Sequence, residues 1–110
     1  MTALFEIQKK ANIRGMSVPM EQVSHIVQER ECAIIYSLSS KAMVSTRPIN
    51  QFEQELEPYG FEMANSCTLV NLAHIDHIDD NREIILTDGS KIKISRRRMY
   101  KFKQYKEPGT

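Results

Sequence analysis

Cationic side chains are concentrated at the carboxy-terminal end of this chain. The last twenty residues hold eight of the fifteen Lys and Arg residues and a single acid, Glu107, which gives a charge of +7. The preceding ninety residues hold seven cations and thirteen acids, a charge of −6. The formal net charge of +1 is therefore the sum of an acidic region and a basic segment, and the basic segment attracts polyanions such as nucleic acids.

Three consecutive arginines, Arg96–Arg98, occupy the middle of this basic segment. The sequence predicts a helix from Arg96 to Lys106, with Met99 and Phe102 three residues apart on one face and Ser95 as its N-cap. Positive charge in the first turn opposes the helix dipole, so helix stability does not explain the arginines. A phosphate group would relieve that repulsion, and we expect the segment to bind one.

The histidines and cysteines could in principle bind a metal or act in catalysis, but they lack the partner residues that either role requires. His74 and His77 lie three apart, which on a strand puts the imidazoles on opposite faces, and no third ligand stands at a zinc-like spacing. Cys67 has neither a glycine-rich oxyanion turn nor a paired acid, and we expect it and Cys32 to be packed thiols. We therefore expect no metal, no cofactor, no enzyme activity and no small-molecule substrate.

Length and composition indicate one globular domain over residues 1–110. The chain is 41% hydrophobic and 26% charged, and no apolar run of about 18 residues could span a bilayer. Its amino-terminus reaches Glu6 before any apolar stretch forms, so it has no pattern of a secretory signal. We expect a cytoplasmic protein.

Short strands account for most of the predicted structure. Alternating apolar residues with β-branched side chains predict strands separated by polar residues every eight to twelve positions, which favours antiparallel sheets. They cover Phe5 to Lys9, Val23 to Gln28, Ala33 to Leu38 and Ala42 to Thr46. The period then changes, because Ile49, Phe52 and Leu56 follow helical spacing. A helix is predicted to open at Pro48 and to stop near Pro58 to Gly60.

A hairpin is predicted next to the basic segment. A three-residue loop, Thr87-Asp88-Gly89 with Gly89 left-handed, pairs Ile84 with Ile92 and Glu83 with Lys93. This register places four apolar side chains on one face and leaves Ile85 beside Lys91 outside. The buried set is Ile84, Leu86, Ile92 and Ile94.

From Phe61 onward the chain reads Phe61-Glu62-Met63-Ala64-Asn65-Ser66-Cys67-Thr68-Leu69-Val70-Asn71, then His74-Ile75-Asp76-His77-Ile78, the Thr87-Asp88-Gly89 hairpin and Ile94-Ser95-Arg96-Arg97. This order of features resembles the LytTR family, the DNA-binding domains of bacterial transcription regulators. The similarity covers roughly residues 18 to 105. The resemblance implies a mainly β fold of about ten short antiparallel strands in several sheets with two short helices, and a grip on DNA made by loops.

Two positions match base-contacting residues of that family. Asn65 precedes the family's Ser and Arg97 follows the hairpin. A third contact in relatives comes from a loop between early strands, where this chain offers Arg30 between two acids. Many relatives have Arg or His where this chain has Glu62, Met63 and Ala64. The remaining cations are candidate phosphate contacts: Lys91, Lys93, Arg96, Arg98, Lys101 and Lys103.

Two asparagines of this segment also have an ordinary structural interpretation. Asn65 could hydrogen-bond its own turn, as asparagine readily does. Asn71 closes an apolar run, and we interpret it as a structural cap.

The resemblance implies double-stranded DNA as the partner, bound by a sequence-specific transcription regulator that forms a homodimer on repeated half-sites. A second hypothesis is a regulatory module that pairs with a membrane inhibitor or a LytTR-bearing partner and binds DNA weakly. The acidic residues Glu29 and Glu31 favour it. RNA binding is a third hypothesis, which the lack of an aromatic stacking pair near the basic segment disfavours.

Overall fold

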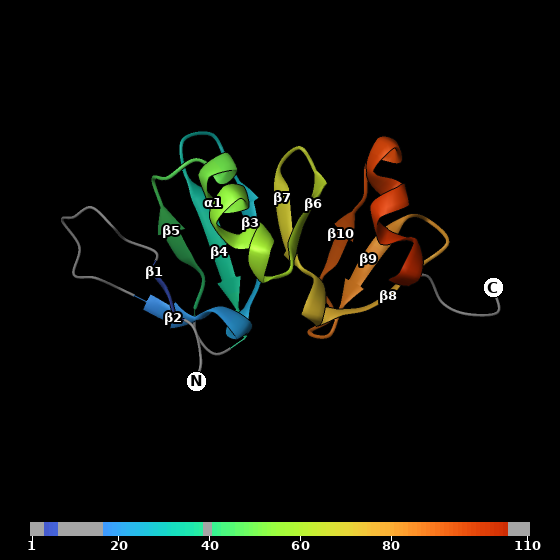
Figure 1. Ribbon diagram of the computed structural model, residues 1–110, viewed down its shortest axis with the longest axis horizontal. Coiled ribbons are helices and arrows are strands. Elements are labelled where there is room, and N and C mark those ends of the chain that lie inside the picture. Colours follow the sequence, from blue (N-terminus) through green and yellow to red (C-terminus); the bar gives the residue numbers. More distant parts are fainter. Residues whose placement is uncertain (1–3, 7–16, 39–40, 106–110) are drawn as a thin grey trace.

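The computed structural model describes residues 4–6, 17–38 and 41–105, which form ten strands and two longer helices (Figure 1). The strands are β1 (Leu4–Glu6), β2 (Ser17–Pro19), β3 (Val23–Gln28), β4 (Ala33–Ser37), β5 (Met43–Ser45), β6 (Phe61–Asn65), β7 (Thr68–Asn71), β8 (Ile75–Ile78), β9 (Glu83–Leu86) and β10 (Lys91–Lys93). The helices are α1 (Ile49–Leu56) and the 3₁₀ helix η4 (Arg96–Tyr105), with single turns η1 (Met20–Gln22), η2 (Glu57–Tyr59) and η3 (Leu72–His74). The mainly β fold with two helices is confirmed.

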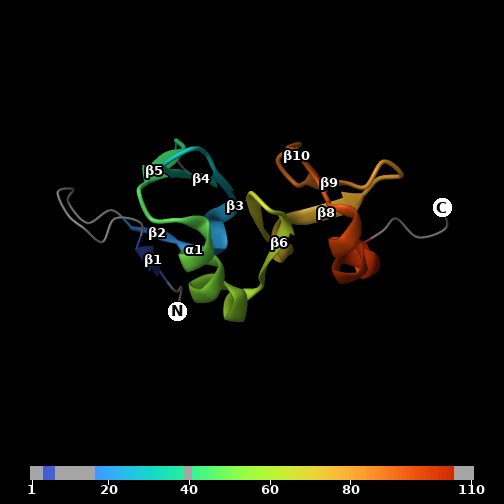
Figure 2. The same cartoon turned by 90° about the horizontal axis from the view of Figure 1, so that it is seen from above.

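All strand pairs are antiparallel, and they form three sheets over the described ranges. β1 pairs with β2, the order β5-β4-β3-β7-β6 makes a five-stranded sheet, and β10-β9-β8 makes a three-stranded one. Seen from above, α1 lies on one side of the five-stranded sheet, and the three-stranded sheet with η4 lies beyond β6 (Figure 2). Three of the four predicted strands match β3, β4 and β5; the fourth matches β1 as far as Glu6, and residues 7–9 lie outside the described residues.

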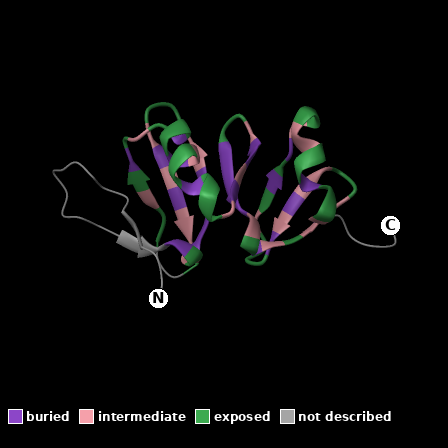
Figure 3. Cartoon of the chain, viewed as in Figure 1, coloured by how far each residue is buried: buried purple, intermediate pink, exposed green. Residues whose placement is uncertain are grey.

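The β6–β7 hairpin separates two hydrophobic cores, because the side chains of a strand alternate between its faces. Phe61, Met63 and Leu69 point into the first core with the buried residues of β3, β4 and α1. Ala64 and Val70 point into the second core with the buried residues of β8, β9, β10 and η4. Buried residues accordingly line both strands of this hairpin at the centre of the molecule (Figure 3).

Helix α1 packs through the three residues that its period predicted, Ile49, Phe52 and Leu56, all of which are buried. Extended Pro48 precedes it, and the backbone reverses at Gly60, whose φ of 91° is a left-handed value that glycine adopts without steric cost.

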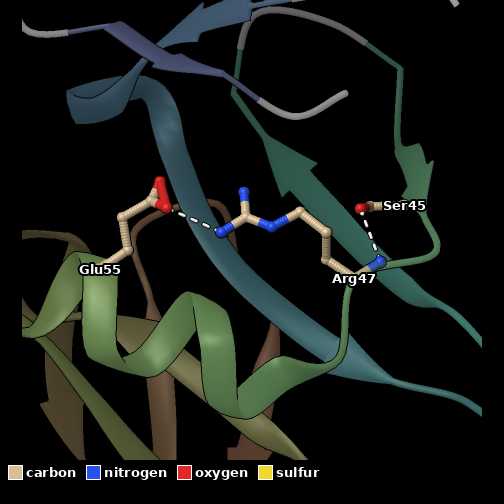
Figure 4. A network of polar contacts seen from close by, with 3 residues as sticks. All are labelled: Ser45, Arg47 and Glu55. Carbon is tan, nitrogen blue, oxygen red and sulfur yellow. Dashed lines mark hydrogen bonds and ion pairs between the residues drawn. The ribbon is translucent and has the colours of Figure 1, made fainter. Parts of the chain in front are cut away.

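Arg47 fastens α1 to the strand before it (Figure 4). Its guanidinium lies 2.7 Å from the Glu55 carboxylate and 4.4 Å from the centre of the Phe52 ring, while its backbone N–H donates to the Ser45 hydroxyl at 3.1 Å. The charge of Arg47 is thus engaged within the fold.

The β9–β10 hairpin follows the predicted register. Ile84 pairs with Ile92, Glu83 with Lys93 and Ile85 with Lys91. Leu86 N–H donates to the Ser90 oxygen at 2.9 Å, which closes the three-residue loop, and Gly89 has a φ of 91°. The four predicted apolar side chains are buried on one face.

The helix predicted after the hairpin is present, but it is wound as a 3₁₀ helix over Arg96–Tyr105, and Lys106 lies outside the described residues. Residues three apart eclipse one another in a 3₁₀ helix, so Met99, Phe102 and Tyr105 form one row against the second core. Ser95 stands at the predicted N-cap position, since its carbonyl accepts Arg98 N–H at 3.0 Å, but its hydroxyl is buried without a hydrogen-bond partner in the described residues and makes no side-chain cap.

Candidate nucleic-acid interface

Four connecting segments lie next to one another along one edge of the molecule. They are the β3–β4 turn (29–32), the β6–β7 turn (66–67), the β10–η4 junction (94–95) and the β8–β9 turn (79–82), and we call them the loop edge. Three hydrogen bonds join the row: Gln28 N–H to the Cys67 oxygen at 2.8 Å, the Asn65 amide to the Lys93 oxygen at 2.7 Å, and Ile94 N–H to the Arg82 oxygen at 2.9 Å. In Figure 1 the first two turns and the start of η4 lie at the upper end of the view.

Asn65, the last residue of β6, leads directly into the β6–β7 turn of the loop edge. Its side-chain oxygen accepts the Cys67 N–H at 2.9 Å, and its amide nitrogen donates to the Lys93 oxygen. One bond shapes the β6–β7 turn, as the structural reading of this residue expected, and the other holds the turn against β10. An amide has two N–H donors and two acceptor lone pairs, so one of each remains for a further partner at this half-buried position.

The three arginines of the triplet point in different directions, because each residue of a 3₁₀ helix turns by about 120°. Arg96 and Arg97 are exposed and Arg98 is half-buried. No side chain of the three forms an ion pair with a described residue. Arg97 begins an outward row that continues with Tyr100 and Lys103, both of them exposed. This row is the most accessible cationic face of η4.

The lysines of the basic segment differ in their surroundings. Lys101 lies 3.0 Å from the Glu62 carboxylate of β6, a hydrogen bond and ion pair that raise the pKa of the lysine. Lys93 donates to the Asn81 oxygen at 3.0 Å but has no carboxylate partner in the described residues. Lys91 is exposed at the opposite end of β10, and Lys103 is exposed on η4. Among these four lysines, only Lys101 forms an ion pair with a carboxylate of the described residues.

The β3–β4 turn brings Arg30 to the same edge. This arginine is exposed between exposed Glu29 and Glu31. Gln28 fixes the turn through its amide, which donates to the Glu29 and Cys32 oxygens at 2.8 and 3.0 Å. Its oxygen accepts the first N–H of α1, at Ile49, at 2.9 Å. The turn is therefore rigidly connected to both the sheet and the helix.

Sequence reasoning missed Arg82 in the β8–β9 turn. Its φ of 59° is the one positive value of a non-glycine residue in the described chain, and its oxygen accepts from the β10–η4 junction. No sequence signal marks this position, because a left-handed residue is normally recognised by Gly or Asn.

The histidines and Asn71 have structural partners. His74 lies in η3 and not on a strand, and its Nε2 donates to the Glu21 oxygen at 2.6 Å. His77 pairs with the Asp76 carboxylate at 2.7 Å. Asn71 caps η3 by accepting Ala73 N–H at 3.0 Å, as predicted, and donates to the Val23 oxygen at 2.8 Å.

The sequence predicted two buried thiols, and neither cysteine is buried. Cys67 is exposed, because it lies in the β6–β7 turn and not inside a strand, and Cys32 is half-buried at the end of the β3–β4 turn.

None of the helices in the described residues is long and apolar enough to cross a membrane. The family model for the LytTr DNA-binding domain matches residues 14–107. Among solved structures, the chain is similar to the LytTr DNA-binding domain of a protein described as a methyl-accepting/DNA response regulator from Bacillus cereus. That likeness has a TM-score of 0.74 at 16% identity and covers 96% of this chain and 97% of the other. No curated protein matches the sequence.

Proposed function

The chain belongs to the LytTR family of DNA-binding domains, and we propose that residues 1–110 act as one such domain, a cytoplasmic, sequence-specific regulator of transcription. The observation that carries this proposal is the start of η4 next to the loop edge, where exposed Arg96 and Arg97 have no ion-pair partner among the described residues and follow the junction that is hydrogen-bonded to the Asn65 turn. Uncompensated cations on a rigid edge suit a polyanion.

Base readout in this proposal belongs to Asn65 and Arg97. Arginine can donate two parallel hydrogen bonds to guanine, and the free half of an asparagine amide can bond a base edge. The Asn65 bond to the Lys93 oxygen keeps the two readers in a fixed relation, because Lys93 lies four residues before Arg97.

Phosphate binding positions the domain on the duplex. The residues proposed for it are Lys91, Lys93, Arg96, Arg98, Lys101 and Lys103, with Arg30 at the other end of the loop edge. Lys101 is the weakest of these, because Glu62 already neutralises part of its charge.

Selection of bound sequences from random duplex DNA tests this function. A sequence-specific regulator enriches one motif, and a homodimer enriches that motif as repeated half-sites. A bound pool with no enriched sequence would contradict sequence-specific readout.

A regulatory interaction module that pairs with a membrane inhibitor or a LytTR-bearing partner is the second candidate. One observation favours it: Val27, Ile34 and Val44 form a cross-strand row on β3, β4 and β5, and Val44 is 55% exposed. If the selection enriches nothing, substituting Val44→Lys and measuring association with a LytTR domain becomes the informative experiment.

A further inference from the structure

We propose that Arg82, in the β8–β9 turn, is a DNA-backbone contact that extends the interface beyond the basic carboxy-terminal segment. The inference rests on the proposed function, because it names a further residue for the same ligand. It begins from the backbone of this residue, whose φ of 59° is left-handed. Residues with a Cβ pay a steric cost there that Gly avoids and Asn reduces.

The hydrogen bonds of the β8–β9 turn do not require an arginine at position 82. Its backbone accounts for the local structure: Arg82 N–H donates to the Asp79 oxygen at 3.2 Å, and the Arg82 oxygen accepts Ile94 N–H. Glycine or asparagine would make the same bonds without the same strain. These backbone bonds therefore do not require the side chain of Arg82, which is half-buried.

The neighbouring acids do not hold the guanidinium. The Asp79 carboxylate accepts the N–H groups of Asn81 and Glu83 at 2.9 and 3.0 Å, the main reasons why its pKa is lowered. Arg82 forms no ion pair with any described residue, although acids flank it in the sequence. Its charge is therefore not neutralised by an ion pair of the described residues, at a half-buried position.

The position of the turn identifies the partner. The Arg82 oxygen accepts Ile94 N–H, so Arg82 lies next to the β10–η4 junction. The ammonium of Lys93, the residue before Ile94, lies 3.0 Å from the oxygen of Asn81, the residue before Arg82. Arg82 and Lys93 are thus two cations at neighbouring positions that form no ion pair with a described residue, and together they attract an anion. A DNA phosphate is the anion that the loop edge would bring there.

The test compares Arg82→Gly, Arg82→Asn and Arg82→Lys with the wild-type chain. Affinity is measured on the selected duplex and on a random duplex of the same length, between about 50 and 200 mM salt. Gly and Asn relieve the backbone strain, so both variants should melt no lower than wild type. Their affinity should fall about five-fold at about 0.15 M salt on both duplexes, and the salt slope should become shallower by about one unit.

The lysine variant keeps the charge and should retain the wild-type slope. Lys41→Ala removes a cation from the opposite end of the five-stranded sheet and should change neither the DNA affinity nor the salt slope. If the Gly and Asn variants bind DNA like wild type while Arg97→Ala loses affinity, the proposed role of Arg82 is overturned and the proposed function is not. Lower melting temperatures with unchanged slopes would make it a structural residue. A wild-type chain without salt-dependent DNA binding would overturn both proposals.

Discussion

The side chain of Asn65 is bound to the backbone of Lys93, with 2.7 Å between amide nitrogen and carbonyl oxygen. These residues are 28 positions apart, and the bond joins the five-stranded sheet to the last strand of the three-stranded one. A second bond from Ser95 N–H to the Ala64 oxygen, at 2.9 Å, reinforces the connection. The β6–β7 turn and the start of η4 therefore behave as one unit.

Replacing Asn65 by Ala should lower both stability and DNA affinity. The variant loses two hydrogen bonds, each worth roughly 0.5 to 1.5 kcal/mol, so the free energy of unfolding should fall by roughly 1 to 3 kcal/mol. Denaturant unfolding measures this loss. In a double variant that carries Asn65→Ala and Arg97→Ala, the two losses of DNA affinity should not add, because both substitutions disturb the same base-contacting unit. Additive losses would mean that the two residues act independently.

Replacing Arg97 by Ala should leave the fold intact and weaken specific DNA binding by about 1 to 3 kcal/mol. The exposed side chain holds no ion pair in the described structure, so the melting temperature should not change. Fluorescence anisotropy on selected and random duplexes measures the affinity. Equal losses on the two duplexes would make Arg97 a phosphate anchor.

Lys101 and Lys103 form a matched pair on η4, because Lys101 pairs with Glu62 whereas Lys103 forms no ion pair with a described residue. Lys103→Ala should make the salt dependence of DNA affinity shallower by about one unit. Lys101→Ala should change it less, because Glu62 already neutralises part of that charge. Equal slopes for both variants would show that the Glu62 pair does not persist in the complex.

His25 gives the fold a predicted pH dependence. The residue is buried on β3, its Nδ1 lies 2.8 Å from the Ser24 hydroxyl, and its ring stacks on Tyr36 with 4.5 Å between the centres. Burial lowers its pKa below the ordinary value of 6.5, and the charge of Asp88 raises it by less.

The unfolded chain therefore binds a proton at His25 at a higher pH than the folded chain does. Stability should fall as the pH drops below about 6.5 toward the folded pKa, and should be fully present above that window. The melting temperature should decrease from about pH 7.5 to about pH 5.5, and His25→Gln should reduce that decrease. An unchanged pH response in the variant would assign the effect to other groups.

Elements with a local sequence signal could be predicted well. The β9–β10 hairpin was readable because Gly89 and the alternation of Ile84, Leu86 and Ile92 agree on one register. Helix α1 was readable from three apolar residues at helical spacing. The 3₁₀ winding of η4 was not, because Met99 and Phe102 satisfy both helix types and the choice depends on packing against the second core.

The candidate interface could be predicted only in part, because its organisation depends on contacts between distant residues. Asn65 and Arg97 were marked by their motif, but the Asn65 bond to Lys93 and the Glu62 pair of Lys101 span 28 and 39 positions. Arg82 was invisible because its left-handed backbone contradicts its residue type.

The salt dependence of DNA affinity tests the central claim most directly. If the loop edge and η4 neutralise four to six phosphates, the slope of log affinity against log salt should lie near −4 to −5 between about 50 and 200 mM salt. Fluorescence anisotropy with the selected duplex and the full chain measures this slope. A steep linear fall of that size is the result we predict, and a flat or undetectable DNA response would contradict a DNA-binding function.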